Sequence, residues 1–161
     1  MAQGDFYLKI DEIEGESKDD KHKNWIDVLS WSWGESNAGA HAMGGGGGAG
    51  KVSMQDFNFV MTVNKATPKL MLACATGKHI KDATLVARKA GGKQEMYLTI
   101  KMSDVLVSSY QTGGSTGAGL PNESVSLNFS KIEYEYRPQK PDGSMDSPVK
   151  VGYDIKANKK V

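Results

Sequence analysis

A glycine-rich stretch in the first third of the chain has the spacing that most resembles a chemical motif. Gly45, Gly50 and Lys51 match the first seven positions of the phosphate-binding loop G-x-x-x-x-G-K. That loop needs a helix after the glycines, because the free amides of a helix N-terminus hold the phosphates. Here a strand-like run follows Lys51, and Val52 stands where a Ser or Thr would contact magnesium. We therefore expect a strand to start at Lys51 and no nucleotide to bind.

The other reactive residue types are scattered. His22, His41 and His79 are far apart, and none has the spacing of a metal site. Cys74 is the only cysteine and falls in the packing stripe of a predicted helix, so we interpret it as a core residue. Sequence order alone leaves a Ser-His-Asp triad open, but the chain has no Gly-x-Ser-x-Gly elbow. We expect no catalytic residues, no metal and no cofactor, and hence a protein that is not an enzyme.

Composition narrows the class of partner. The chain has 161 residues, with 20 basic and 19 acidic side chains and a net charge of +1. This balance argues against nucleic acid as a partner. No signal-like N-terminus and no run of 18 apolar residues is present, so we expect no cleaved signal peptide and no membrane insertion. The length predicts a single domain spanning residues 1–161, and one lone cysteine favours folding in the cytoplasm.

The elements that position these residues are mostly strands, because apolar and polar side chains alternate along most of the chain. The alternating segments are 6–13, 25–34, 52–63, 83–89, 96–107, 125–136 and 149–155. One short helix is predicted, with Thr67 as its N-cap, Pro68 at its first position and Gly77 after its end. Seven or so strands and one helix indicate a mainly β fold, an antiparallel β-barrel or two packed sheets.

Two details of the strand pattern bear on function. Leu29, Trp31 and Trp33 share one predicted face, and Ser30 and Ser32 share the other with Val28. The serines either lie in water or line a surface that must stay smooth, such as a channel wall. The apolar alternation also changes phase near Gln55–Asp56 and near Ser130–Lys131, which predicts two β-bulges.

Three polar segments are predicted as loops. The charged segment 14–24 is interpreted as a solvated connection. The segments 35–50 and 108–122 are rich in glycine, and the former is long enough to need a functional explanation. In the last predicted strand, Val149, Val151 and Tyr153 share one face.

Several long motifs, in order, resemble one protein family. They are IDVLSWSWG at 26–34, MGGGGGAG at 43–50, KATPKLMLAC at 65–74, VLVSS at 105–109 and VSLNF at 125–129. With these motifs the chain resembles Hcp, the haemolysin-coregulated protein family of bacterial type VI secretion systems. The resemblance runs from the first predicted strand to the last, and we expect no added toxin domain after Val161.

The resemblance implies a barrel related to phage tail-tube proteins. Six copies would form a ring, and rings would stack into a hollow tube with a sheath around it and a spike protein at its tip. The tube would be secreted by the type VI system and carry effector proteins in its lumen. Ser30 and Ser32 are then predicted to face the lumen and effectors. A ring-stacking or inter-subunit loop is predicted at His41, Met43, Gly44, Gly45, Gly46, Gly47, Gly48 and Lys51.

Two other functions compete with this one. The same strands would also build a monomeric β-sandwich that binds a ligand such as a carbohydrate. A nucleotide-dependent enzyme is the third interpretation, and it requires Lys51 to bind phosphate. The number of chains in the purified particle separates the tube subunit from the monomeric module.

Overall fold

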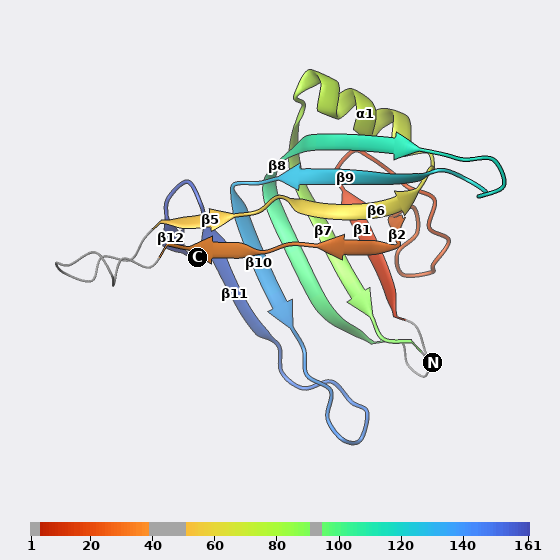
Figure 1. Ribbon diagram of the computed structural model, residues 1–161. Helices are drawn as coiled ribbons and strands as arrows, with labels where there is room; N and C mark the ends of the chain where they lie inside the picture. The colour runs from red at the N-terminus through yellow and green to blue at the C-terminus, as the bar shows by residue number, and fades with distance from the viewer. Residues whose placement is uncertain (1–3, 39–50, 91–94) are drawn as a thin grey trace.

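The computed structural model describes residues 4–38, 51–90 and 95–161 (Figure 1). Within these ranges the chain forms one helix and twelve strands, more strands than the seven or so predicted. The elements are β1 (Asp5–Ile10), β2 (Ile26–Val28), β3 (Ser30–Ser32), β4 (Glu35–Asn37), β5 (Val52–Met54), β6 (Phe57–Thr62), α1 (Thr67–Thr76), β7 (His79–Arg88), β8 (Met96–Gly113), β9 (Asn122–Asn128), β10 (Lys131–Tyr136), β11 (Val149–Asp154) and β12 (Lys159–Lys160). The count rises because the predicted strands 25–34, 52–63 and 125–136 each split in two where the chain changes its pairing partner. The strands β4 and β12 lie outside the predicted strands, and β4 lies within the predicted loop 35–50.

The mainly β, antiparallel architecture is confirmed, and its layers are organised by β8. The first half of β8 pairs with β7 on one side and β10 on the other, whereas its second half pairs with β9. Figure 1 shows β8 curving from the layer that contains β7 and β10 into the layer that contains β9 and β6. One layer therefore has the order β12-β11-β10-β8-β7-β1-β2, and the other has the order β8-β9-β6-β3.

The short strands β2 and β3 bring the two layers together on the opposite side. β2 pairs with β1, and β3 pairs with β6, although only Leu29 separates them. The Leu29 amide donates to the carbonyl of Val60 at 2.8 Å. One stretch of chain thus serves both layers. The two layers are continuous through β8, but the hydrogen-bond ladder is interrupted at Leu29, so they are not joined by a ladder on this side.

Because of this interruption, the predicted orientations of Val28 and Leu29 are wrong. Val28 is buried and Leu29 is 55% exposed, the reverse of the predicted arrangement. The side-chain alternation restarts where the chain passes from one sheet to the other, so Trp31 and Trp33 still pack against the core. The fully buried centre lies between the layers and includes Leu8, Ile26, Phe57, Phe59, Leu85, Ile100, Met102 and Leu127.

The predicted helix is present as α1, and it lies across the second half of β8 (Figure 1). Its buried residues are Leu70 and Ala73, and Cys74 is partly buried against the core. Gly77 ends the helix with φ of 66°, in the left-handed region that glycine adopts at little cost. The predicted N-cap is wrong, because Ala66 holds that position and Thr67 is the first helical residue.

The predicted bulge near Gln55–Asp56 is confirmed by the strand registers. Ser32 pairs with Asn58, and Glu35 pairs with Met54. Two residues therefore lie opposite three, and the extra residue changes the inward set from even to odd positions. At Ser130 the change of phase is a corner, where the chain leaves β9 and enters β10 in the other layer.

Three loop and strand predictions need correction. Nearly half of the predicted loop 108–122 is strand, because β8 extends to Gly113 and β9 begins at Asn122. In β11 the two valines of the predicted shared face are exposed, Val149 at 63% and Val151 at 57%. The segment 14–24 is not simply solvated, since it contains the buried residues Ser17 and His22.

Candidate functional site

An uncharged polar surface covers the outer side of the layer formed by β3, β6 and β9. The registers align Ser30 with Val60 and Ser124, and they align Ser32 with Asn58 and Ser126. Inward-pointing aromatic and aliphatic residues alternate with these positions, and this fixes the polar ones outward. We call Ser30, Ser32, Asn58, Ser124 and Ser126 the serine face.

The amide of Asn58 organises the centre of the serine face. Its Nδ2 atom donates to the hydroxyl oxygens of Ser124 and Ser126, each at 3.1 Å. Ser30 and Ser32 are exposed on the neighbouring strand. At one end Asp56 accepts hydrogen bonds from the Ser108 hydroxyl at 2.5 Å and the Asn128 amide at 2.9 Å. The result is a surface of short hydroxyl and amide side chains that also includes Val60, with the hydrogen-bonded carboxylate of Asp56 beside it.

The sequence identified two members of this surface and missed three. Ser30 and Ser32 are exposed on one face of β3, as the alternation predicted. Asn58, Ser124 and Ser126 were missed, although they alternate with Phe57, Phe59, Val125 and Leu127 and follow the same period. The missing information was which strands are neighbours, since only pairing brings the five residues together.

Lys51 precedes β5, so the residues after it form a strand and not the helix that a phosphate loop requires. Its side chain is exposed. The other members of the predicted contact loop lie outside the described residues; they are His41, Met43, Gly44, Gly45, Gly46, Gly47 and Gly48. What the structure adds is a two-stranded hairpin, β4 with β5, that carries both ends of this loop.

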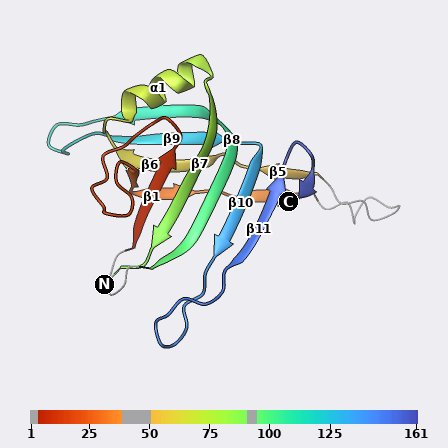
Figure 2. The ribbon, with the colours of Figure 1, turned by 180° about the vertical axis from the view of Figure 1, so that it is seen from behind.

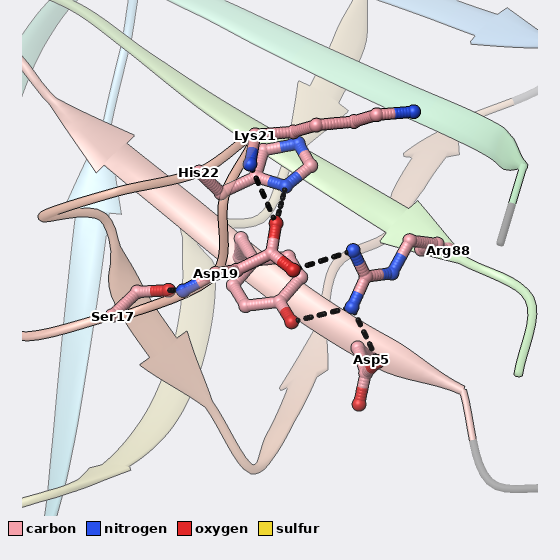
Figure 3. A network of polar contacts seen from close by, with 7 residues as sticks. Asp5, Ser17, Asp19, Lys21, His22 and Arg88 are labelled. Carbon is pink, nitrogen blue, oxygen red and sulfur yellow. Dashed lines mark hydrogen bonds and ion pairs between the residues drawn. The ribbon is translucent and has the colours of Figure 1, made fainter.

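A second polar cluster fixes segment 14–24 to β1 and β7 (Figure 3). Arg88 donates from Nη1 to Asp19 Oδ1 at 2.7 Å, and from Nη2 to Asp5 Oδ2 and the Tyr7 hydroxyl, both at 2.9 Å. His22 Nδ1 lies 2.8 Å from Asp19 Oδ2, and its ring stacks on Tyr7 with centroids 4.7 Å apart. We call Asp5, Tyr7, Asp19, His22 and Arg88 the Arg88 network.

The electrostatics of the Arg88 network are those of a structural anchor. The hydrogen bond from Arg88 outweighs burial and, with a further one from His22, lowers the pKa of Asp19 to about 2. Asp19 therefore stays ionised beside a guanidinium whose side chain is only 6% exposed. Burial raises the pKa of Tyr7 in spite of the nearby Arg88 charge, so its hydroxyl keeps its proton.

Within residues 4–38, 51–90 and 95–161, the chemistry of a nucleophile or a metal centre is not assembled. Both described histidines pair with carboxylates away from the serine face, His22 with Asp19 and His79 with Asp104. No group of three or more His, Cys, Asp or Glu side chains in these ranges is arranged to hold a metal ion. In the same ranges, no helix is both long and apolar enough to cross a membrane.

Known proteins resemble this chain in both sequence and fold. Residues 7–136 match the family model described as "Type VI secretion system effector, Hcp". The chain is 52% identical to Protein hcp1 of Pseudomonas aeruginosa over 156 residues, which is 96% of each chain. The crystal structure of Hcp1 from Salmonella typhimurium superimposes with a TM-score of 0.80 at 39% identity, covering 99% of this chain and 100% of that one. The solved structure of another type six secretion system protein gives a TM-score of 0.93 at 31% identity, covering 99% of this chain and 100% of that one.

Proposed function

Because this chain belongs to the Hcp family of the type VI secretion system, we propose that it is a structural subunit of the inner tube of that system. Six copies close into a ring, and the rings stack into a hollow tube. The tube is secreted by the type VI system and carries effector proteins in its lumen. The observation that carries this proposal is the 52% identity to Protein hcp1 over 96% of both chains.

Exposed apolar side chains on the strands support an assembling subunit. Leu29 is 55% exposed, Leu106 36%, Val149 63% and Val151 57%. Val149 and Val151 lie together on one face of β11, and assembly would cover an apolar patch of this kind. The layer containing the serine face also ends at β3, whose pairing in the described residues is with β6 alone, and an open edge of this kind favours association.

The serine face is the part of this subunit that we assign to the lumen. Short uncharged side chains make a wall that neither fills the channel nor traps a passing protein by strong ion pairs. Ser30 and Ser32 then contact the cargo, and Asn58 holds the neighbouring serines in place. The tube subunit needs no catalytic residue or cofactor for this role. Its partners are other copies of the chain, the spike, the sheath and effector proteins.

The loop between β4 and β5 is proposed to contact a neighbouring subunit or the next ring. Its members are those predicted from the sequence, and Lys51 lies at the root of the hairpin that carries them. A contact at this position would join two copies through the loop, in addition to any contact between the edges of their sheets.

Particle mass and shape test the proposal directly. Native mass spectrometry of the purified chain should give a species near six times 17.4 kDa, or about 104 kDa, because closed rings have a fixed copy number. Negative-stain images should show rings with a central hole. A particle that remains monomeric at about 100 µM would contradict the tube subunit, because tube building needs lateral association at accessible concentrations, and would favour the monomeric ligand-binding module.

The lumen assignment has its own test. Ser32→Trp should leave assembly of the hexamer intact, because the side chain is exposed. It should reduce the amount of effector protein that co-purifies with the wild-type hexamer, because the large indole side chain would project into the channel. Ser147→Trp, a change at an exposed position in the turn region before β11, is the matched control. Unchanged assembly together with unchanged effector recovery in Ser32→Trp would refute the assignment.

A further inference from the structure

A shallow pocket of about 250 Å³ opens at one end of the serine face. It lies on β6, β8 and β9, near the hairpin that joins β8 to β9, on the side of the molecule away from the C-terminus (Figure 2). Its volume is below the range of about 300–1,000 Å³ that small-molecule sites usually have, so it suits a single side chain. The lining residues, which we call the Gln111 pocket, are Val60, Gln111, Thr112, Asn122, Glu123 and Ser124.

Strand pairing puts Gln111 in line with the serine face. Gln111 pairs with Ser124 on β9, and Ser124 pairs with Val60 on β6. Val60 pairs in turn with Ser30. The neighbouring Tyr110 packs against the core, so Gln111 points outward on the same side of the layer as Ser124. The Gln111 pocket is therefore part of the surface that we assign to the lumen.

The amide of Gln111 is free to bind a partner. Its side chain is exposed and makes no hydrogen bond with any residue that the structure describes. The amide of Asn58 differs, because its nitrogen already donates to Ser124 and Ser126. A free glutamine side chain offers two N–H donors and one carbonyl acceptor. A second amide presents the same groups, so the two can exchange hydrogen bonds in both directions.

The Gln111 pocket offers no available charge. Glu123 is the ionisable residue among its six lining residues, and it is only 2% exposed. Its carboxylate is turned toward α1, where it accepts hydrogen bonds from the hydroxyls of Thr67 and Tyr110. Burial and then the hydrogen bond with Glu123 raise the pKa of Tyr110, so this hydroxyl keeps its proton. A charged guest would lose water without gaining an opposite charge, which favours a neutral polar guest.

We propose that the Gln111 pocket binds one carboxamide side chain, Gln or Asn, of a cargo protein, and that Gln111 selects it through hydrogen bonds in both directions. Val60 packs against the methylene groups of the guest side chain. A neutral hydrogen bond is weak, so a single contact releases easily, whereas several copies of the pocket in one ring act together on a cargo protein. This inference rests on the proposed lumen function and names the chemistry of the cargo contact.

Methyl NMR of the wild-type protein tests the pocket, with labelled valine methyl groups and Val60 as the reporter. The probe is N-acetyl-glutamine amide. N-acetyl-methionine amide and N-acetyl-lysine amide are the comparison probes, since they share its backbone amides but lack the carboxamide. The Val60 signals should shift with the glutamine probe. Each comparison probe should bind at least about threefold more weakly, because its side chain cannot exchange hydrogen bonds with Gln111 in both directions.

Gln111→Met tests the residue itself, because it keeps the length of the side chain and removes its donor and acceptor. It should weaken binding of the glutamine probe at least about threefold and lower the recovery of the effector that co-purifies with the wild type. Gln139→Met makes the same change at an exposed position in the turn region before β11 and should match the wild type in both measurements. Circular dichroism and native mass spectrometry check that both variants fold and assemble.

Three results would overturn the carboxamide site. They are Val60 signals that stay fixed up to about 100 mM glutamine probe, equal binding of all three probes, and wild-type affinity in Gln111→Met. In each case, hexamers seen by native mass spectrometry would leave the proposed tube function standing. If the wild type is itself monomeric, the proposed function fails, and the cargo role of the Gln111 pocket fails with it.

Discussion

The Arg88 network and the serine face use polar side chains in opposite ways. In the network, the charged groups of Arg88 and Asp19 are turned toward each other, and they hold segment 14–24 against β1 and β7. On the serine face, uncharged groups point outward, and Ser30 and Ser32 remain exposed. A charged segment predicted as a loop, 14–24, is therefore a fixed part of the fold, whereas the exposed functional surface is proposed on regular strands.

The largest expected effect comes from removing the guanidinium. Arg88→Met should destabilise the fold by about 3–5 kcal/mol, because it leaves the largely buried carboxylate of Asp19 without its cation. Thermal or urea unfolding measures the change. Lys101→Met, at an exposed position of β8 in the same layer, is the control and should change stability by less than about 0.5 kcal/mol.

A double-mutant cycle sharpens that result. Because Arg88 and Asp19 interact directly, the loss in Arg88→Met/Asp19→Asn should be clearly smaller than the sum of the two single losses. Additive losses would mean that the two residues act independently, and the network would then not be the anchor of segment 14–24.

Acid should lower the free energy of unfolding through Asp19, which belongs to the same network. The pKa of Asp19 falls from its ordinary 3.8 in the unfolded chain to about 2 in the folded protein, so its contribution is present above pH 4 and is lost as the pH falls toward 2. The expected loss is about 2 kcal/mol by linkage, read from urea unfolding at a series of pH values. Asp19→Asn should remove this part of the pH dependence, and an unchanged slope in that variant would assign it to other carboxylates.

A smaller effect is expected on the serine face. Asn58→Ala removes the donor shared by Ser124 and Ser126 and should cost about 0.5–1.5 kcal/mol, since water can replace a partly exposed hydrogen bond. Ser30→Ala is the control, because no side-chain hydrogen bond of Ser30 occurs within the described residues. A loss above about 3 kcal/mol would show that Asn58 supports the fold as strongly as a buried charged group.

Local patterns account for what the sequence predicted correctly. Helix α1 was found from Pro68 and Gly77, because both restrict the backbone at their own positions. The bulge after β5 was found because one extra residue changes the alternation of its own strand. The exposed serines of β3 were found for the same reason, since strand alternation places neighbours on opposite faces.

Contacts between distant segments account for what was missed. Arg88 and Asp19 are separated by 69 positions, and no local pattern indicates that one neutralises the other. Val149 and Val151 alternate as inward residues should, yet their strand lies beyond the packed core and leaves them exposed. The family resemblance supplied the fold and the secretion system, whereas the membership of the serine face required the strand order.

A cryo-electron microscopy reconstruction of the assembled particle is the most direct test of the central claim, that the serine face of a ring-forming subunit lines a channel. We expect a closed ring in which Ser30, Ser32 and Asn58 of every copy border the central hole, with the rest of each subunit outside it. A ring that carries the serine face on its outer wall, or buries it between subunits, would contradict the claim.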